Sequence, residues 1–325
     1  MLGRVGAVLL ALATCGLARP ALAIQCDKAT ARPDKLICAD AALRDADAAM
    51  SAAYASLRAG LPKAEQPGLL ADQRQWLSER AACIVDADGK DVADAPAIAC
   101  MRTSTEARRS FLAGGAPKAT PRITPRFLYR PGARDRYGVE IAYPEIAGAD
   151  TPALRAANAL LRRAAIGDWA GPRRGDGDHL VHQARYRVTL ATPRFASIDV
   201  STYDNDDAAY PRTGGTALTI DLATGKAVPL AALLRPGAVD SAIKLCTAQL
   251  AAYYSKALGQ PWQPPAPAVH AVANDVGNWE FFPDRAILAF RENSLGPHAL
   301  GAYDCTIDAK TLATMVRPGG PVGAP

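Results

Sequence analysis

The sequence predicts an α+β protein: a disulfide-linked antiparallel helical hairpin followed by a domain with a mainly antiparallel sheet. Three observations lead to this fold class. The chain has 325 residues, which is too long for one ordinary domain. In the first third, apolar residues recur at alternating spacings of three and four, as on one face of a helix. The rest contains strand-like segments, then a helical pattern, then more strands, an order typical of antiparallel α+β domains.

Residues 1–23 have the pattern of a cleaved secretory signal. Arg4 precedes the apolar run Val5–Leu17, and Ala21-Leu22-Ala23 provides the small residues that a signal peptidase requires. A lipoprotein signal, with Cys15 as the lipidated residue, is the alternative. The apolar run is too short for a permanent membrane span, and no later segment is long and apolar enough for one. We therefore expect an exported protein, with the periplasm as the first choice of compartment.

Residues 24–112 predict two helices joined by a short loop. Asp40 is placed to cap the first helix, Gly60-Leu61-Pro62 ends it, and Pro67 suits the first turn of the second. The inward stripe of the first helix contains Leu43, Asp47, Met50, Tyr54 and Leu57. The inward stripe of the second contains Leu69, Gln73, Trp76, Arg80 and Cys83. Two such helices with a short connection form an antiparallel hairpin.

Two charged residues, Asp47 and Arg80, interrupt these apolar stripes. They lie nearly the same number of positions before and after Lys63, near the centre of the loop. Because both helices rise by about 1.5 Å per residue, the two charges should face each other across the hairpin. We expect a structural ion pair between them. Trp76 is expected in the hairpin core, with an anchor for a partner protein as the alternative.

Six cysteines follow the leader, and an even number in an exported chain predicts disulfides. Cys38 precedes the first helix and Cys83 ends the second, so the two should meet at the open end of the hairpin. This predicts Cys38–Cys83, which leaves Cys26–Cys100 as the second pair. Each bridge is expected to stabilise this small, alanine-rich region by a few kcal/mol.

The composition changes after the hairpin. Residues 113–122 have the composition of a linker, residues 123–316 form the second domain, and residues 317–325 are a tail. Six strands are expected, at Val139–Tyr143, Arg185–Ala191, Ala196–Tyr203, Ala217–Leu222, Ala286–Phe290 and Tyr303–Ile307. A helix should run from Pro152 to about Ile166, and another carries Val239, Ile243, Cys246, Leu250 and Tyr253 on one stripe. Cys246 therefore faces the sheet that holds Cys305, which predicts the pair Cys246–Cys305.

The first region resembles the LprI family of lysozyme-inhibitor domains. The residues that carry the resemblance are Cys26, Asp34–Asp40, Leu43, Asp47, Tyr54, Gln73–Leu77 and Arg80–Cys83, with Arg74 and Trp76 inside the Gln-Arg-x-Trp-Leu motif. The chain departs from the family pattern after Cys83. There, Ile84–Ala99 is expected to be an inserted loop, and the end helix is reduced to Ser104–Leu112. The resemblance implies a domain that engages lysozyme and has no catalytic role.

The second region is similar to the extracytoplasmic domain of RsiV-type anti-sigma factors, a module that also accompanies PdaC-type peptidoglycan deacetylases. The carrying segments are Ile141–Pro144, Gly214-Gly215, Asp221–Lys226 and Leu295–Gly301, together with Leu230, Leu233 and Leu234. The family's Gly-Ala-His turn is here Gly215-Thr216-Ala217, without the histidine, and the family's tyrosine before the last strand is also missing. The resemblance implies binding of lysozyme at the cell envelope.

The sequence gives little support to catalysis, metal binding or nucleic-acid binding. The formal net charge of +5 is small, and no basic run interleaves with aromatic residues. Asp204–Asp207 lacks the glycine and distal glutamate of a calcium loop and is expected to be a solvated hairpin tip. His179 and His182 are expected to be a surface pair, with Asp176 and Asp178 in the same loop. No Gly-x-Ser-x-Gly nucleophile motif is present. We expect no cofactor and no enzyme.

Two functions remain after these exclusions. The first is a non-enzymatic inhibitor or binder of lysozyme-like muramidases that works by steric block of the cleft. The alternative is a cell-envelope sensor or a module that binds peptidoglycan or another envelope protein, without lysozyme inhibition.

Overall fold

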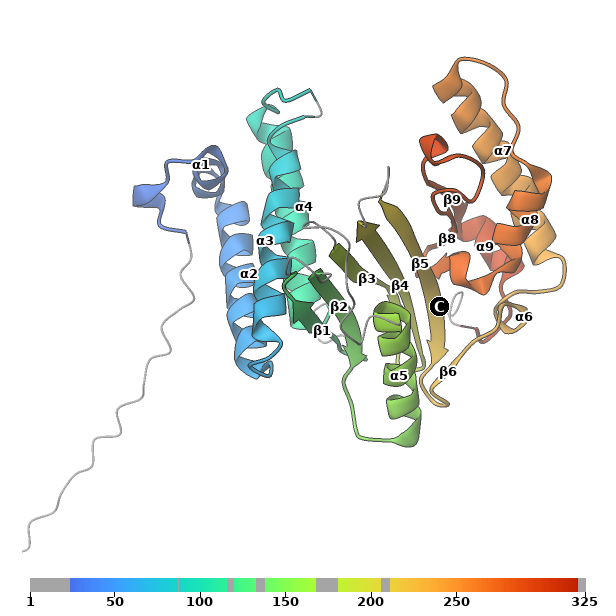
Figure 1. Ribbon diagram of the computed structural model, residues 1–325, viewed down its shortest axis with the longest axis horizontal. Coiled ribbons are helices and arrows are strands. Elements are labelled where there is room, and N and C mark those ends of the chain that lie inside the picture. Colours follow the sequence, from blue (N-terminus) through green and yellow to red (C-terminus); the bar gives the residue numbers. More distant parts are fainter. Residues whose placement is uncertain are drawn as a thin grey trace, which may run out of the picture.

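The computed structural model describes residues 24–86, 88–115, 120–132, 138–167, 181–205 and 211–320. Three parts follow one another along the long axis: a helical region, a six-stranded sheet and a C-terminal lobe with a small sheet (Figure 1). The expected fold class, helices first and then a mainly antiparallel sheet domain, is confirmed.

The helical region begins with two short elements and continues with three longer helices. Its elements are η1 (Cys26–Lys28), α1 (Arg32–Ala39), α2 (Ala41–Gly60), α3 (Gln66–Arg80), η2 (Ala81–Cys83) and α4 (Asp94–Ala113). Asp40 caps α2 as expected, because its side chain accepts a hydrogen bond of 2.7 Å from the amide of Leu43. The predicted hairpin corresponds to α2 and α3.

The last helix of this region starts earlier than the sequence pattern predicts. Instead of a long loop to Ala99 and a helix from Ser104, α4 begins at Asp94. Asp94 and Pro96 favour a first helical turn. An acidic residue there complements the helix dipole, and proline fits because amides of the first turn have no hydrogen-bond partner within the helix. Because aspartate and proline are also common in loops, the pattern alone does not distinguish the two.

The earlier start of α4 changes the disulfides. The predicted pairs Cys38–Cys83 and Cys26–Cys100 are wrong: Cys26 bonds Cys38 and Cys83 bonds Cys100. Since α4 runs back alongside the end of α3, it places Cys100 with its Cα 5.5 Å from that of Cys83. Cys38, at the end of α1, is left beside η1.

The central sheet has six strands in sequential order: β1 (Ile123–Arg130), β2 (Gly138–Ile146), β3 (Val181–Ala191), β4 (Phe195–Asn205), β5 (Arg212–Asp221) and β6 (Lys226–Ala227). β2 and β3 are parallel, and the other neighbours are antiparallel. The parallel pair needs a crossover, and α5 (Pro152–Ile166) lies between its two strands in sequence. Thr151 caps this helix by accepting from the amide of Leu154.

One face of the sheet packs on α5. The shared core contains apolar residues from both layers: Val139, Ile141, Ala157, Leu161, Ala165, Ala184, Ile198, Val200 and Ile220. Alternate residues of the same strands, such as Arg185 and Asp199, point to the opposite face. The face toward α5 is therefore apolar, and the opposite face is polar at β3 and β4.

The Asp221–Lys226 segment forms the tight turn between β5 and β6. The side chain of Asp221 accepts from the amide of Ala223, and the amide of Gly225 donates to the carbonyl of Asp221. Gly225 has φ +69°, and a Cβ at this position would lie 2.1 Å from the carbonyl oxygen of Ala153. The turn thus fits directly under the first turn of α5.

Gly225→Ala is expected to lower the free energy of unfolding by more than about 2 kcal/mol. The left-handed conformation alone costs an alanine about 1–2 kcal/mol, and the clash with Ala153 adds to it. Chemical denaturation of the two proteins measures the difference. Gly259→Ala is the matched control, since Gly259 has φ +68° and a Cβ there would meet no atom within 4 Å. Equal losses in both variants would contradict the steric argument.

The C-terminal lobe contains α6 (Leu230–Leu233), α7 (Ala238–Leu258), α8 (Ala266–Asn274), η4 (Val276–Asn278), η5 (His298–Leu300) and α9 (Ala309–Met315), with the antiparallel strands β7 (Trp279–Phe281), β8 (Arg285–Phe290) and β9 (Tyr303–Asp308). One face of this small sheet packs with α7, α8 and α9 around Trp279, Phe281 and Leu288. Cys246 on α7 bonds Cys305 on β9, as the sequence predicted.

The helical region and the central sheet share a core. Met50, Leu69 and Trp76 of the helices pack with Phe127 of β1 and Ala142 of β2. Gly68 of α3 approaches β1 so closely that a Cβ there would lie 2.7 Å from the Cβ of Phe127. Because the two regions pack against each other in this way, the division of the chain into two domains at residues 113–122 remains a proposal. Residues 116–119 of that segment and residues 321–325 of the expected tail lie outside the described part of the chain.

Candidate functional site

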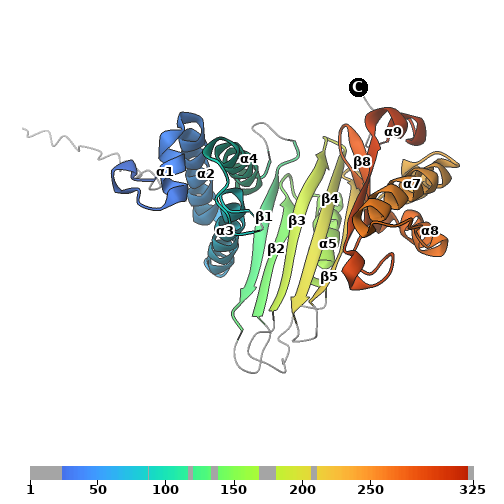
Figure 2. The same ribbon diagram turned by 90° about the horizontal axis from the view of Figure 1, so that it is seen from above.

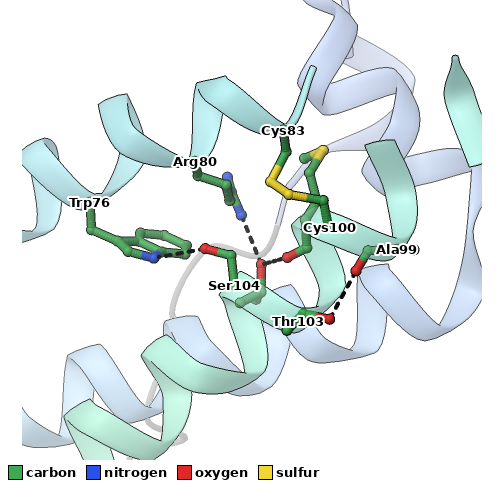
Figure 3. Close-up of a disulfide and its surroundings, with 9 residues drawn as sticks. Trp76, Arg80, Cys83, Ala99, Cys100, Thr103 and Ser104 are labelled. Atoms are coloured by element: carbon green, nitrogen blue, oxygen red, sulfur yellow. Dashed lines mark hydrogen bonds between the residues drawn. A yellow bond between two sulfur atoms is a disulfide. The ribbon is translucent and has the colours of Figure 1, made fainter. Parts of the chain in front are cut away.

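The centre of the helical region is a charged core around Trp76. Arg80 lies with its guanidinium carbon 4.6 Å from the centre of the Trp76 ring and donates to Asp47 and Thr105, both at 3.2 Å. The Trp76 indole donates to the hydroxyl of Ser104 on α4, next to the Cys83–Cys100 bridge (Figure 3). The expected pair of Asp47 and Arg80 is thus present, with side chains only 11% and 9% exposed. These residues hold the three helices together.

A second buried ion pair extends this core toward the sheet. Arg108 of α4 lies 2.6 Å from Asp72 of α3 and donates to Gln73. Its guanidinium also lies over the ring of Phe111. The sequence pattern does not predict this pair, because the position of Arg108 against α3 depends on where α4 begins. A signal was present: Asp72 stands four residues before Trp76, on the same face of α3.

At the outer end of the helical region, hydrogen bonds and ion pairs hold the loop between η2 and α4 in place. The side chain of Asp86 accepts from the amides of Asp88 and Lys90, and a β-bridge joins Val85 to Asp91. Arg32 of α1 pairs with Asp91 at 2.8 Å and with Asp94 at 3.0 Å, and donates to the carbonyls of Ile84 and Val92. Together with the adjacent disulfide, these bonds preorganise an exposed acidic loop.

Tyr54 and Arg74, the other motif residues, lie away from the charged core. Tyr54 is half-buried and lines a shallow groove of about 580 Å³ between α2 and α3, together with Met50, Arg58 and Gln73. Arg74 is exposed on α3. The structure therefore brings together Asp47, Trp76 and Arg80, with Tyr54 at the edge of the apolar cluster that contains Trp76 and Arg74 outside it.

The polar face of the central sheet forms the floor of a groove of about 800 Å³, which we call the central trough. Its floor is lined by Gln183, Arg185, Arg187, Asp199, Ser201 and Thr213. Its walls are Gln75 of α3 on one side and Glu280, Arg291, Glu292 and Asp304 of the C-terminal lobe on the other. Seen from above, the helical region and the C-terminal lobe stand at opposite edges of the sheet (Figure 2).

Ion pairs connect the floor of the trough to both walls. Arg185 of β3 lies 2.6 Å from Glu79 of α3. On the other side, Arg187 lies 2.6 Å from Glu280 of β7, and Arg291 lies 2.8 Å from Asp199 of β4. The charged residues of the trough thus position the three parts of the protein relative to one another.

Glu280 stands out among these groups because it is only 3% exposed. Burial raises the pKa of Glu280, and the neighbouring carboxylate of Asp199 raises it further, against the opposing effect of Arg187. Asp304 contributes in the same direction. The raised pKa of this carboxyl group therefore results first from its burial.

Of the other predicted polar positions, His182 and Asp204 lie together at one end of the sheet. His182, expected at the surface, is buried at 3% exposure with Nδ1 2.6 Å from Asp204. The reason is the register of β3, which turns His182 inward, level with Asp204 on β4. His179, Asp176, Asp178, Asp206 and Asp207 lie outside the described residues. Within the described part, no group of three or more His, Cys, Asp or Glu residues could hold a metal ion.

The glycines of the second region have a structural role. Gly215 on β5 has φ +150°, and a Cβ there would lie 2.3 Å from the carbonyl of Val200 on β4. The Leu295–Gly301 segment contains the buried Leu295 and η5. Beside these segments, the hydroxyl of Thr213 donates to Glu292, whose carboxylate lies 3.4 Å from Nδ1 of His298.

The N-terminal region is thus a disulfide-linked helical module whose buried charges serve its own packing. Residues 26–112 match the family model described as lysozyme inhibitor LprI. The match contains both N-terminal disulfides, the charged core and the acidic loop. The family description is that of an inhibitor, and it covers this region alone. No curated protein matches the chain.

Two solved structures of DUF3298 family proteins are similar to part of the chain. One, from Bacteroides fragilis NCTC 9343, is 11% identical with a TM-score of 0.42, covering 62% of this chain and 96% of that one. The other, from Pseudomonas aeruginosa PAO1, is 15% identical with a TM-score of 0.41, covering 64% and 99%. The RsiV-type resemblance of residues 123–316 stays a prediction.

The compartment follows in coarse terms from the disulfides. Three disulfide bonds together with an LprI region indicate an extracytoplasmic protein. Among the described residues, no helix has the length and apolar character needed to cross a membrane.

Proposed function

We propose that this protein is exported through the signal in residues 1–23, acts in the periplasm, and binds a lysozyme-like muramidase so that the substrate cleft is blocked. The observation that carries the proposal is the LprI match over residues 26–112. Inhibition is steric, and the protein itself performs no chemistry on the wall.

The contact surface that we favour is the exposed acidic loop at the outer end of the helical region. The loop contains three acids, Asp86, Asp88 and Asp91, and one base, Lys90, and all four are exposed. A rigid loop loses little conformational entropy on binding, and its negative charge suits the basic surface of many lysozymes. The disulfide and Arg32 keep the loop in shape.

The test is a titration of the full mature chain against c-, g- and i-type lysozymes, with wall lysis and binding measured in parallel. We expect inhibition of at least one class. Asp88→Lys should weaken it, whereas Asp240→Lys, the same charge change on an exposed position of α7, should leave it unchanged. No binding to any class at tens of micromolar would overturn the proposal.

The same purified full chain tests the alternative function. Retention of the full chain on purified sacculi, with no effect on any lysozyme, would favour an envelope sensor or a peptidoglycan-binding module.

Equal loss of inhibition in Asp88→Lys and Asp240→Lys would instead move the contact surface away from the acidic loop.

A further inference from the structure

The groove between α2 and α3, which we call the hairpin groove, lies at the surface of the helical region, where the two helices run side by side (Figure 1). Its volume is about 580 Å³. Gln66 and Gln73 of α3 both line it and are seven positions apart, so it follows about 10 Å of that helix. This length corresponds to two helical turns. The other lining residues all belong to α2: Met50, Ser51, Tyr54, Ala55, Arg58 and Ala59.

Two exposed leucines border the hairpin groove. Leu70 and Leu77 of α3 are 41% and 43% exposed, and each stands four positions after a glutamine that lines the groove. Because residues four apart on a helix are neighbours on one face, both leucines lie along the α3 side. On the α2 side, Ser51 and Ala55 are small. Interaxial distances depend on the side chains at the contact, so this side allows another helix to approach closely.

The charged groups at the hairpin groove are arginines. Arg58 lines it, and Arg74 stands on α3 between the two leucines. Both are exposed, and neither makes an ion pair among the residues that the structure describes. The lining contains no acid, and the nearby Glu65 and Asp72 are each paired with another arginine. The groove therefore combines apolar surface with positive charge that is not neutralised by these acids.

We infer that the hairpin groove binds an amphipathic helix of a partner protein. The apolar residues of this helix pack on Tyr54, Leu70 and Leu77, and its carboxylates face Arg58 and Arg74. An amphipathic helix presents apolar side chains at i, i+3 or i+4, and i+7, which span the same two turns as the groove. Charge complementarity selects an acidic helix.

The position of the groove separates it from the acidic loop. Gln66 donates to the carbonyl of Arg58 next to the α2–α3 connection, so the groove lies toward the closed end of the hairpin. The acidic loop follows Cys83 at the opposite end. The inference therefore goes beyond the function proposed above and does not depend on it.

The probe is the capped peptide Ala-Ala-Ala-Leu-Glu-Ala-Ala-Leu-Glu-Ala-Leu-Glu-Ala-Ala-Leu-Glu-Ala, an amphipathic helix with glutamates beside its leucines. It is titrated into the full mature chain at low ionic strength and followed by amide chemical shifts. We expect saturable shifts in α2 and α3 and weaker binding as salt is added. The same peptide with lysine in place of each glutamate should bind more weakly.

Two variants test the two kinds of contact. Arg74→Glu should weaken binding of the glutamate peptide roughly five-fold, and Leu77→Gln should weaken it by a similar factor, about five-fold. Because both side chains are exposed, both variants should fold normally, which equal unfolding midpoints would verify. The matched controls are Arg102→Glu, at an exposed position of α4, and Leu258→Gln, at a position of α7 that is 46% exposed. Both controls should leave the affinity unchanged.

The inference is overturned by an absence of saturable shifts at millimolar peptide, by equal binding of the lysine peptide, or by equal weakening in the control variants. Two further results would assign the groove to another occupant and also overturn it. One is retention of the chain on phosphatidylglycerol vesicles, without peptide binding, that is lost in Arg74→Glu. The other is a dimer of the free chain that Arg74→Glu dissociates. Arg74→Glu should retain any lysozyme inhibition, which separates this result from that of the proposed function.

Discussion

Asp47→Ala is expected to lower the free energy of unfolding by about 3–5 kcal/mol, because it leaves the buried guanidinium of Arg80 without its carboxylate. Arg80 is held over Trp76 and, among the residues that the structure describes, retains Thr105 as its hydrogen-bond partner. Thr105 is fully buried and also donates to the carbonyl of Met101. Chemical denaturation of the full chain measures the change.

The matched control removes both charges. Replacing a buried ion pair by apolar residues of similar volume is often neutral, so Asp47→Leu combined with Arg80→Met should lose much less than Asp47→Ala alone. An equal or larger loss in the double variant would mean that packing, and not the unpaired charge, determines the effect. A small loss in Asp47→Ala would mean that water reaches Arg80.

This ion pair was predictable because both residues belong to one hairpin. Counting outward from the loop places Asp47 and Arg80 at the same level, and local helical periodicity is strong in both segments. Asp72 and Arg108 were not predictable in the same way, since their meeting depends on where α4 begins. The disulfide error has the same origin. Once α4 starts at Asp94, Cys100 lies beside Cys83.

The edge of the central sheet shows a second limit of the sequence pattern. β1 was missed because Pro125 interrupts it, and proline argues against a central strand. β1 is an edge strand, where a proline is tolerated, and Pro125 lies opposite Pro144 of β2. The strands of the middle of the sheet were predicted, but β3 begins at Val181 and not at Arg185, and β5 begins at Arg212 and not at Ala217.

The central trough could not be predicted from periodicity. Arg187 and Glu280 are 93 positions apart, and Arg291 and Asp199 are 92 apart. Each has the pattern of an ordinary surface charge on its own strand. Only the packing of the C-terminal lobe against the polar face of the sheet makes them partners.

The second large effect is expected at the junction of the helical region and the sheet. Glu65, in the loop before α3, accepts two hydrogen bonds from Arg126 of β1 and one of 3.1 Å from the amide of Phe127. Arg126 also lies 2.8 Å from Glu145 of β2. Glu65→Ala is expected to lower the free energy of unfolding by about 2–3 kcal/mol, since charge-assisted bonds are lost and the Phe127 amide loses its partner.

The same contact should make stability depend on acid. Burial alone would raise the pKa of Glu65, but the hydrogen bonds from Arg126 and Phe127 outweigh it and hold the pKa below its ordinary value. The contribution of Glu65 is therefore fully present above its unfolded pKa and is lost as the pH falls through the lower folded value. Denaturation curves from neutral pH down to about pH 3 measure this decrease in the free energy of unfolding, which is the acid limb of the stability curve.

Glu65→Gln separates charge from shape. A glutamine can still accept from Arg126 or Phe127 but does not titrate, so it should cost less than Glu65→Ala at neutral pH and flatten this part of the acid limb. An unchanged acid limb in Glu65→Gln would assign the pH dependence to other carboxylates.

Because Phe127 also packs in the core with Leu69 and Trp76, loosening this contact should weaken the attachment of the helical region to the sheet. The LprI region is then best tested for lysozyme binding as part of the full chain, where β1 covers the face of α3 that an isolated fragment would expose.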